Sequence, residues 1–190
     1  MIRSFIAIDL PSGVQRALEE LAAELKKSDA PVGWVRPEAI HLTLKFLGSV
    51  PEEMVASISS TLEQIARSVS PFQLQPCGCG AFPSIKQARV VWVGLQGDNG
   101  QLAELQKMVE TAMVPFGFQP EGRPFRGHLT LGRVKGRQRL QALQQILLAR
   151  QGFITEPFDV AELVLYKSEL RPEGARYTPL FRAPFAGRPD

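Results

Sequence analysis

The tetrapeptide His41-Leu42-Thr43-Leu44 occurs a second time in this chain, as His128-Leu129-Thr130-Leu131. The chain has two histidines among its 190 residues, so each histidine opens one copy of the motif. Internal repeats are sought before any local pattern because they decide the organisation of the whole fold.

Each copy of the motif is typical of a strand with one polar and one apolar face. Side chains along a strand alternate between its two faces, so the histidine and the threonine of each copy share a face. The apolar face can join a core while the polar face lines a cleft. The expected faces are these: His41, Thr43 and Lys45 on the polar face of the first strand, Leu42, Leu44 and Phe46 on its apolar face, and His128 with Thr130 on the polar face of the second.

The elements predicted around the two copies follow one order: strand, helix, motif strand, helix, strand. Apolar residues at helical spacing indicate the helices, and runs rich in β-branched and aromatic residues indicate the strands. In the first half these are a strand over 4–10, a helix after a capping box of Ser12 and Gln15, the motif strand over 41–47, a helix after Pro51 and a strand over 72–75. In the second half they are a strand over 88–95, a helix over 102–116, the motif strand over 128–134, a helix over 140–147 and a strand over 158–168.

The matched order indicates an internal duplication with pseudo-two-fold symmetry. The interval from Leu10 to His41 is 31 residues, and the interval from Leu95 to His128 is 33. A two-fold axis places equivalent surfaces opposite each other, so we expect the two His-Thr pairs to face one another across a cleft between two lobes. The half-repeats run roughly over 1–86 and 87–190, within one bilobal domain over 1–190.

Besides the repeated elements, we expect a loop over 78–84 and a C-terminal hairpin of strands 158–168 and 175–183 around a turn at 172–174.

The composition narrows the class of protein. A net charge of +3 and a pI near 9.1 are mildly basic, which suits an anionic ligand but does not by itself indicate nucleic acid. We expect no membrane span, because no apolar run is long enough, and no signal peptide, because Asp9 interrupts the first apolar stretch. Cys77 and Cys79 are too few for a zinc site and are expected to be reduced thiols of a cytoplasmic protein.

Two imidazoles across a cleft suit concerted acid–base catalysis. With an ordinary pKa near 6.5, one ring can be neutral and accept a proton while the other is protonated and donates one, each contributing typically ~10²–10⁴-fold. The hydroxyls of Thr43 and Thr130 can bind non-bridging phosphate oxygens. Positive charge close to the motifs is supplied by Lys45, Arg126 and Arg133. Strict alternation turns Arg133 away from His128, but Gly132 between them can permit a bulge that re-aims the arginine.

Other chemistries fit the sequence less well. A single histidine on a half-buried strand is usually structural, but two in matched contexts favour a site. Two histidines without nearby Asp, Glu or Cys supply fewer protein ligands than the roughly three of a catalytic zinc. The chain shows no nucleophile elbow for a catalytic serine or cysteine, and no glycine-rich phosphate loop.

These motifs resemble those of the two-histidine phosphoesterases, and specifically the branch of RNA 2′,3′-cyclic phosphodiesterases, also known as 2′-5′ RNA ligases. Paired His-x-Thr-x motifs in half-chain repeats are the signature of the superfamily. The closer resemblance extends over nearly the whole chain, and four stretches carry it: the segments over 3–8, 34–48, 80–83 and 128–133.

The resemblance implies a bilobal α+β fold, two mainly antiparallel sheets with flanking helices and the active site in the cleft. It implies hydrolysis of RNA 2′,3′-cyclic phosphate ends to 2′-phosphomonoesters, without metal or cofactor. His41 would be the proton donor and His128 the proton acceptor, while Thr43, Thr130 and Arg133 would bind the phosphate. The expected partner is RNA with 2′,3′-cyclic phosphate termini, tRNA fragments being one candidate, and the protein is expected to act as a monomer.

Two further functions stay open at this point. Ligation of a 2′,3′-cyclic end to a 5′-hydroxyl uses the same chemistry in reverse, and a non-catalytic module that binds RNA ends needs no turnover at all. Phe82 or Tyr166 can stack on a base, although core packing is the commoner role of such aromatics. The arginines that can reach RNA phosphates are Arg36, Arg126 and Arg171, although most surface arginines have no such role.

Overall fold

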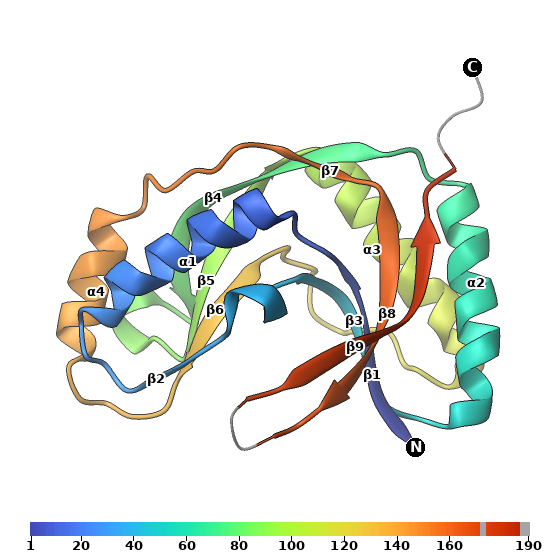
Figure 1. The fold of residues 1–190 in the computed structure, drawn as a ribbon, viewed down its shortest axis with the longest axis horizontal. Coiled ribbons are helices and arrows are strands. Elements are labelled where there is room, and N and C mark those ends of the chain that lie inside the picture. The colour runs from blue at the N-terminus through green and yellow to red at the C-terminus, as the bar shows by residue number, and fades with distance from the viewer. Residues whose placement is uncertain (172–173, 187–190) are drawn as a thin grey trace.

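The computed structural model describes residues 1–171 and 174–186 and arranges them as two antiparallel sheets with helices on their outer sides (Figure 1). The fold is α+β, as expected. The first sheet has the strand order β3-β1-β8-β9 and the second has the order β2-β6-β5-β4-β7. The strands are β1 (Ile2–Ile8), β2 (Val32–Trp34), β3 (Leu42–Val50), β4 (Phe72–Phe82), β5 (Val90–Gly97), β6 (Leu129–Val134), β7 (Phe158–Val160), β8 (Glu162–Glu169) and β9 (Arg176–Pro184).

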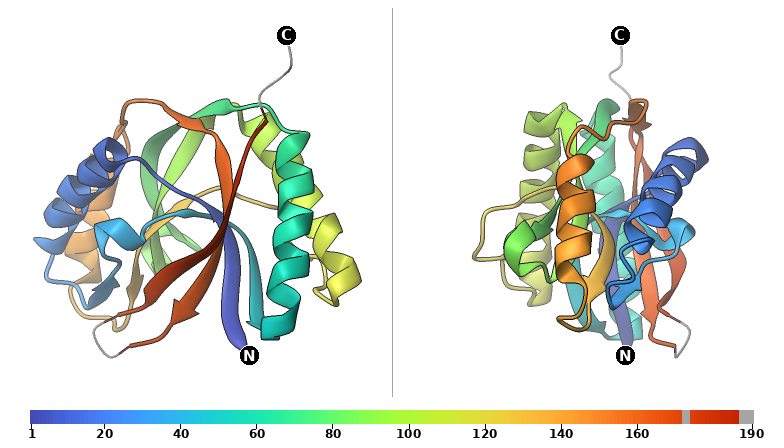
Figure 2. Two further views of the ribbon diagram at one scale, coloured as in Figure 1. Left: turned by 45° about the vertical axis from the view of Figure 1, so that its right-hand side comes forward. Right: turned by 90° about the vertical axis from the view of Figure 1, so that its left-hand side faces the viewer.

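The α-helices divide between the two sheets. They are α1 (Ser12–Lys26), α2 (Val55–Arg67), α3 (Asn99–Met113) and α4 (Leu140–Ala149). Helix α2 contacts β8 and β9 of the first sheet, and α3 contacts β3 and α2. Helices α1 and α4 contact each other, and α4 contacts β4 of the second sheet. The two helix pairs therefore lie at opposite ends of the molecule, with the sheets between them (Figures 1 and 2).

The two halves of the chain interleave. The repeat relates β3 to β6, β1 to β5 and β8 to β4. The neighbours β3-β1-β8 in the first sheet therefore correspond to the neighbours β6-β5-β4 in the second. Strand β8 belongs to the second half of the chain but pairs with β1, while β4 belongs to the first half but pairs with β5. Because each sheet needs a strand from both halves, we expect one domain over 1–190 rather than two lobes that fold separately.

The leucines of both motifs lie in the core, as the alternation predicts. Leu42, Leu129 and Leu131 are fully buried, and Leu44 is nearly so. Burying a leucine side chain contributes roughly 1.5–3 kcal/mol, so four leucines hold the two motif strands firmly in their sheets. The histidines and threonines beside them are only half-buried.

A bulge at the same position of both motif strands changes the alternation beyond the fourth residue. In β3, Thr43 is opposite Ala7 and Lys45 is opposite Ile6, so Leu44 is the extra residue. In β6, Leu131 is the extra residue in the same way, since Thr130 is opposite Trp92 and Gly132 is opposite Val91. An extra residue shifts every later side chain to the other face.

The bulge corrects one expectation and supports another. Lys45 was expected on the face of His41, and Phe46 on the face of the leucines. Both expectations were wrong, because Lys45 is buried and Phe46 is 67 % exposed. The matching shift in β6 leaves Arg133 exposed. The re-aiming that Gly132 was expected to permit is therefore present, with the extra residue at Leu131.

Three other expectations differ from the structure. Ser12 does not cap α1, because the N-cap is Pro11 and no side chain makes a capping bond. The loop expected over 78–84 is largely strand, since β4 continues to Phe82. The strand contains a bulge of its own at Gly78, whose φ is +64°. The strand expected over 158–168 is split into β7 and β8, which join different sheets. The hairpin of β8 and β9 is confirmed, whereas Pro172 and Glu173 of its expected turn lie outside the described residues.

Candidate active site

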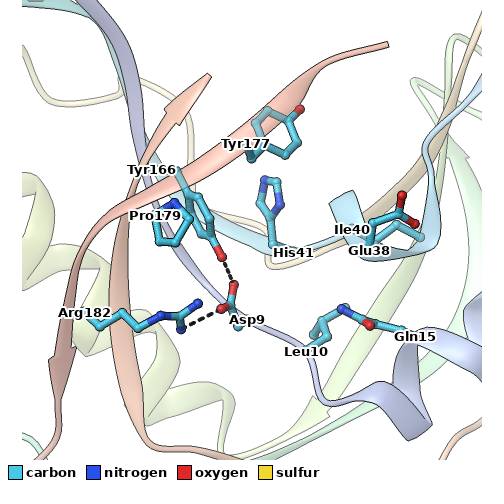
Figure 3. Close-up of a pocket in the computed structure, with 10 residues that line it drawn as sticks. All are labelled: Asp9, Leu10, Gln15, Glu38, Ile40, His41, Tyr166, Tyr177, Pro179 and Arg182. Carbon is cyan, nitrogen blue, oxygen red and sulfur yellow. Dashed lines mark hydrogen bonds and ion pairs between the residues drawn. The ribbon is translucent and has the colours of Figure 1, made fainter. Parts of the chain in front are cut away.

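His41 lies directly before β3 in a group of aromatic rings from the first sheet. Its ring stacks on Phe5 of β1 with centroids 4.6 Å apart, and the ring of Tyr177 from β9 meets it edge-on at 5.0 Å. Figure 3 shows the imidazole between Tyr177 and Asp9. These contacts fix the plane of the imidazole.

Burial lowers the pKa of His41 from 6.5 to about 4. Burial penalises the charged form of an imidazole because the surrounding protein solvates a cation less well than water does. Two smaller influences raise the pKa: the carboxylate of Asp9 and a hydrogen bond to the backbone carbonyl of Ala39. In the absence of substrate, His41 is therefore neutral at pH 7.

The carboxylate of Asp9 is held beneath His41 by two donors. The hydroxyl of Tyr166 on β8 donates to Oδ1, and Arg182 on β9 donates to Oδ2 at 2.9 Å (Figure 3). Arg182 also pairs with Glu162. Burial and the bond to Asp9 raise the pKa of Tyr166, so the hydroxyl remains a donor. Strand β1 thus ends in an anchored negative charge close to the first histidine.

A pocket of about 260 Å³ opens beside His41. This volume is just below the ~300–1,000 Å³ of typical small-molecule sites, so the pocket suits one part of a larger ligand. Its lining is mostly polar and comes from β1, α1, the segment before β3, and the C-terminal hairpin. The lining residues are Asp9, Leu10, Gln15, Glu38, Ile40, His41, Tyr166, Tyr177, Pro179 and Arg182 (Figure 3).

His128 occupies the equivalent place before β6 and is oriented by its own backbone. Its Nδ1 lies 2.7 Å from the carbonyl oxygen of Arg126, two residues upstream. A carbonyl can only accept, so in the neutral ring Nδ1 carries the hydrogen and Nε2 keeps a lone pair. The ring of Phe82 meets the imidazole edge-on at 5.0 Å. Each histidine therefore uses the carbonyl two residues before it and an aromatic neighbour.

One charge effect and one hydrogen bond link the two sheets at the motif faces. The charges of Arg133 on β6 and Arg3 on β1 both act on Tyr177 of β9, where they lower a pKa that burial raises. Arg36, which follows β2 of the second sheet, donates to the carbonyl of Ala175 beside β9 at 3.1 Å. The polar end of β6 therefore lies close to the hairpin that covers His41.

The remaining candidates from the sequence divide between the site and the rest of the fold. Thr43 and Thr130 are half-buried two residues after their histidines, and Arg133 is exposed. Lys45 is not available to a phosphate, because it is buried on the opposite face. Tyr166 is not available for stacking, because it is 9 % exposed and bound to Asp9.

Phe82 and the outlying arginines have local partners. Phe82 lies against His128 and Trp92. Arg171 pairs with Glu169, Arg36 with Glu38, and Arg126 supplies its carbonyl to His128. Thus Phe82 adjoins the candidate site, and Arg36 reaches its edge through Glu38 of the pocket lining. No described contact links the side chains of Arg126 and Arg171 to the site.

Several residues at the site were not predicted from the sequence. Asp9, Phe5, Tyr177 and Arg182 surround His41, and Phe46 is exposed on its face. Asp9 and Tyr166 are 157 residues apart, so only the pairing of β1 with β8 brings them together. The signal that was available is the repeat itself, in which Phe46 and Arg133 follow their motif histidines at the same spacing.

Metal ligands do not gather at this site. Within residues 1–171 and 174–186, no group of three or more His, Cys, Asp or Glu side chains is arranged to hold a metal ion. Burial raises the pKa of Cys79 to about 11, so its thiol is a poor nucleophile and a poor ligand.

No helix in the described part of the chain is both long enough and apolar enough to cross a membrane.

Comparison with known proteins shows where this arrangement occurs. The sequence model of the family described as "LigT like Phosphoesterase" matches the chain twice, over residues 8–92 and 93–177. The chain belongs to this family. The resemblance based on the two motifs is therefore confirmed, and the LigT-like phosphoesterase family accounts for both halves of the repeat.

Relatives and solved structures agree with this assignment. The RNA 2′,3′-cyclic phosphodiesterase of Methanothermobacter thermautotrophicus is 36 % identical over 177 residues, which are 93 % of this chain and 95 % of that protein. The protein of the same name from Aeropyrum pernix is 34 % identical, over 90 % and 97 % of the two chains. The crystal structure of TT0787 from Thermus thermophilus superposes with a TM-score of 0.81 at 27 % identity, covering 98 % and 99 %. Escherichia coli LigT bound to 3′-AMP superposes with a TM-score of 0.72 at 28 % identity, covering 97 % and 98 %.

Proposed function

We propose that this protein hydrolyses the 2′,3′-cyclic phosphate at the end of an RNA to a 2′-phosphomonoester, with His41 as proton donor and His128 as proton acceptor. The observation that carries the proposal is the pair of motif strands with matching bulges, each beginning at an oriented histidine. Relatives of 36 % and 34 % identity named RNA 2′,3′-cyclic phosphodiesterase support the same substrate.

The proposed reaction uses one water and moves two protons. Water attacks phosphorus while His128 takes its proton on Nε2. The bond between phosphorus and the 3′ oxygen breaks, and His41 donates a proton to that oxygen. The product keeps the phosphate on the 2′ oxygen, and the reaction needs neither a metal nor a cofactor.

The hydrogen bond of His128 supports the role of proton acceptor. The carbonyl of Arg126 holds the hydrogen on Nδ1, so the lone pair of Nε2 is the basic position. After accepting a proton, the ring still donates to the same carbonyl, which stabilises the cation by a charge-assisted bond. No rearrangement is needed when His128 takes the proton.

The surroundings of His41 support the role of proton donor once a phosphate is bound. Asp9 favours the protonated ring, and the face of Phe5 at 4.6 Å adds a cation–π attraction. In the free protein burial outweighs both, but a bound phosphate brings a further negative charge to the imidazole. Substrate binding therefore completes the acid by raising the pKa of His41.

Three side chains are proposed to hold the phosphate. Thr43 and Thr130 supply a hydroxyl from each half, and Arg133 supplies the positive charge that the bulge in β6 turns toward the site. Phe46 is proposed to offer its exposed ring to the terminal base, since aromatic side chains often stack on single-stranded RNA. These assignments make a site for one terminal nucleotide.

The partner is proposed to be RNA with 2′,3′-cyclic phosphate ends, including fragments of tRNA, acted on by a monomer in the cytoplasm. Ligation is a second candidate with the same machinery, since a 5′-hydroxyl that attacks in place of water breaks the same bond to the 3′ oxygen and gives a 2′-5′ linkage. The LigT-like family, in which such ligation is found, favours this candidate. A module that binds RNA ends without turnover is the alternative from another class.

The test is a direct product analysis. An oligonucleotide with a 2′,3′-cyclic phosphate end is incubated with the protein in the presence of EDTA, and the product is examined by mass spectrometry and ³¹P NMR. We expect gain of one water and a phosphate on the 2′ oxygen. A 3′-phosphate product or turnover lost in EDTA would contradict the mechanism, and binding without turnover would favour the end-binding module.

A further inference from the structure

Lys45 follows the first motif directly, and the fold buries it. It is the only Lys, Arg, Asp or Glu that is buried, at 6 % exposure, within residues 1–171 and 174–186. The bulge at Leu44 turns its side chain away from His41 and into the layer between β3 and α3. A lysine is almost never fully buried unless it is paired, so its partners indicate why it is there.

The ammonium of Lys45 has two partners outside its own sheet. Nζ lies 2.5 Å from Oε2 of Glu110 on α3, whose side chain is 12 % exposed. The same nitrogen donates to the backbone carbonyl of Gln119 at 2.9 Å. One side chain of β3 therefore contacts both the helix and the segment that follows it.

Glu110 extends the network further into that segment. Its Oε2 accepts the backbone N–H of Glu121 at 3.2 Å, and its Oε1 accepts from the side-chain amide of Gln106 at 3.1 Å. The segment 117–127 runs from the end of the short turn Val114–Phe116 to His128 and forms neither helix nor strand along its fully described length. Most of its residues are exposed. The pair of Lys45 and Glu110 is thus a polar attachment of the segment to the core through Gln119 and Glu121, in addition to the apolar packing of Phe118 and Phe125.

Stability alone is a poor explanation for this pair. Taking both charges out of water is costly, and a buried ion pair can often be replaced by apolar residues of similar volume without loss of stability. Buried pairs are better explained when they fix one arrangement among several. Here the arrangement in question is the path of the segment that ends at the second histidine.

We propose that the ion pair of Lys45 and Glu110 is a positioning device for the reaction: it holds segment 117–127 against the strand of the first motif and so fixes His128 relative to His41. This proposal rests on the proposed function. The far end of the segment contains the carbonyl of Arg126 that orients His128. A shift of the segment moves that carbonyl and turns the imidazole with it. Misplacing a catalytic group by ~1 Å can cost about 10²-fold in rate.

The test replaces both partners together. The variant Lys45→Met with Glu110→Leu removes the pair without leaving a charge unpaired in the core, so its thermal midpoint is expected to stay close to that of the wild type. The matched control is Glu63→Leu with Arg67→Met, which removes an exposed ion pair on α2. Three quantities are measured for each protein: the unfolding midpoint, hydrogen exchange of the amides in 117–127 without substrate, and kcat and KM on an oligonucleotide with a 2′,3′-cyclic phosphate end.

We expect the double variant to exchange faster in 117–127 and to lose about 10²-fold in kcat with little change in KM, while the control matches the wild type. A folded double variant with wild-type exchange and wild-type kcat overturns the proposal. Glu110→Gln is the second variant, in case the double variant does not fold. It keeps the shape and removes the charge, and the same two results apply to it. If the wild type itself shows no turnover, the proposed function fails, and hydrogen exchange alone still decides whether the pair holds the segment.

Discussion

His41 should titrate near pH 4 in the free protein and at a higher pH when a phosphate is bound. Burial lowers its pKa from 6.5 to about 4. At ~1.4 kcal/mol per pH unit, this difference corresponds to about 3 kcal/mol of preference for the neutral ring. The ring is partly exposed, so solvent screening makes this an upper value.

The same preference should appear in the stability of the fold. Above pH 6.5 the ring is neutral in both the folded and the unfolded chain and contributes no difference. As the pH falls from 6.5 to 4, His41 binds a proton in the unfolded chain but stays neutral in the folded protein. The free energy of unfolding therefore falls by up to about 3 kcal/mol. Below pH 4 both forms are protonated and the loss stops growing. Denaturant unfolding of the wild type and of His41→Asn at pH 7 and pH 4 measures this difference.

Proton NMR gives the titration directly, because the chain has only two histidines. The variant His128→Asn assigns the His41 signal. We expect a midpoint near pH 4, moved upward by adenosine 2′-phosphate. By linkage the same ligand then binds more tightly at lower pH. A midpoint at or above 6.5 in the free protein, or one that the ligand leaves unchanged, would refute this account of the acid.

Three further predictions follow from single contacts. Asp9→Asn removes the charge that favours protonated His41, so its NMR midpoint should fall further and the alkaline limb of the kcat–pH profile should move to lower pH; an upward move would contradict this. Gly132→Val should destabilise the fold by roughly 1–3 kcal/mol in denaturant unfolding, because an added Cβ meets Val32 of β2 at 2.6 Å; unchanged stability would show that the close approach of β2 to β6 does not need glycine. Phe46→Ala should leave the unfolding free energy within about 0.5 kcal/mol, as expected for an exposed side chain. It should raise KM for the oligonucleotide about 5-fold or more, at ~1–3 kcal/mol per stacked base, and an unchanged KM would remove Phe46 from the site.

The motif repeat was sufficient to predict the duplicated order of elements and the candidate histidines, and the family resemblance that the motifs carry implied the α+β fold class. His41 and His128 are visible because four residues recur at matched positions, and the leucines between them obey a strand pattern that burial enforces. The family that the motifs resemble is the family to which the chain belongs. The roles of the two histidines stay proposals, because the repeat makes the two sites alike.

The register of the strands could not be predicted from the alternation of polar and apolar residues. Whether Leu44 and Leu131 are extra residues depends on how β3 and β6 pair with β1 and β5, and alternation within one strand does not contain that information. Lys45 was consequently placed on the wrong face. The bulge expected near Gly132 is present, with Leu131 as the extra residue, and Gly132 leaves room for Val32 of the neighbouring strand β2.

The residues that surround His41 also could not be predicted from the sequence. Asp9 ends the first strand, while Tyr166 and Arg182 belong to the C-terminal hairpin. Strand β8 pairs with β1 across the boundary between the repeats, so no local pattern joins these residues. The lowered pKa of His41 depends on this packing and not on the motif.

The central claim is that His41 and His128 act together on one phosphate. It is tested most directly by the turnover of an RNA oligonucleotide with a 2′,3′-cyclic phosphate end by the wild type, His41→Asn and His128→Asn, each shown to be folded by its unfolding midpoint. We expect a 2′-phosphate product from the wild type and a loss of ~10²-fold or more in kcat for each variant. A folded variant of either histidine that turns over the substrate at the wild-type rate would contradict it.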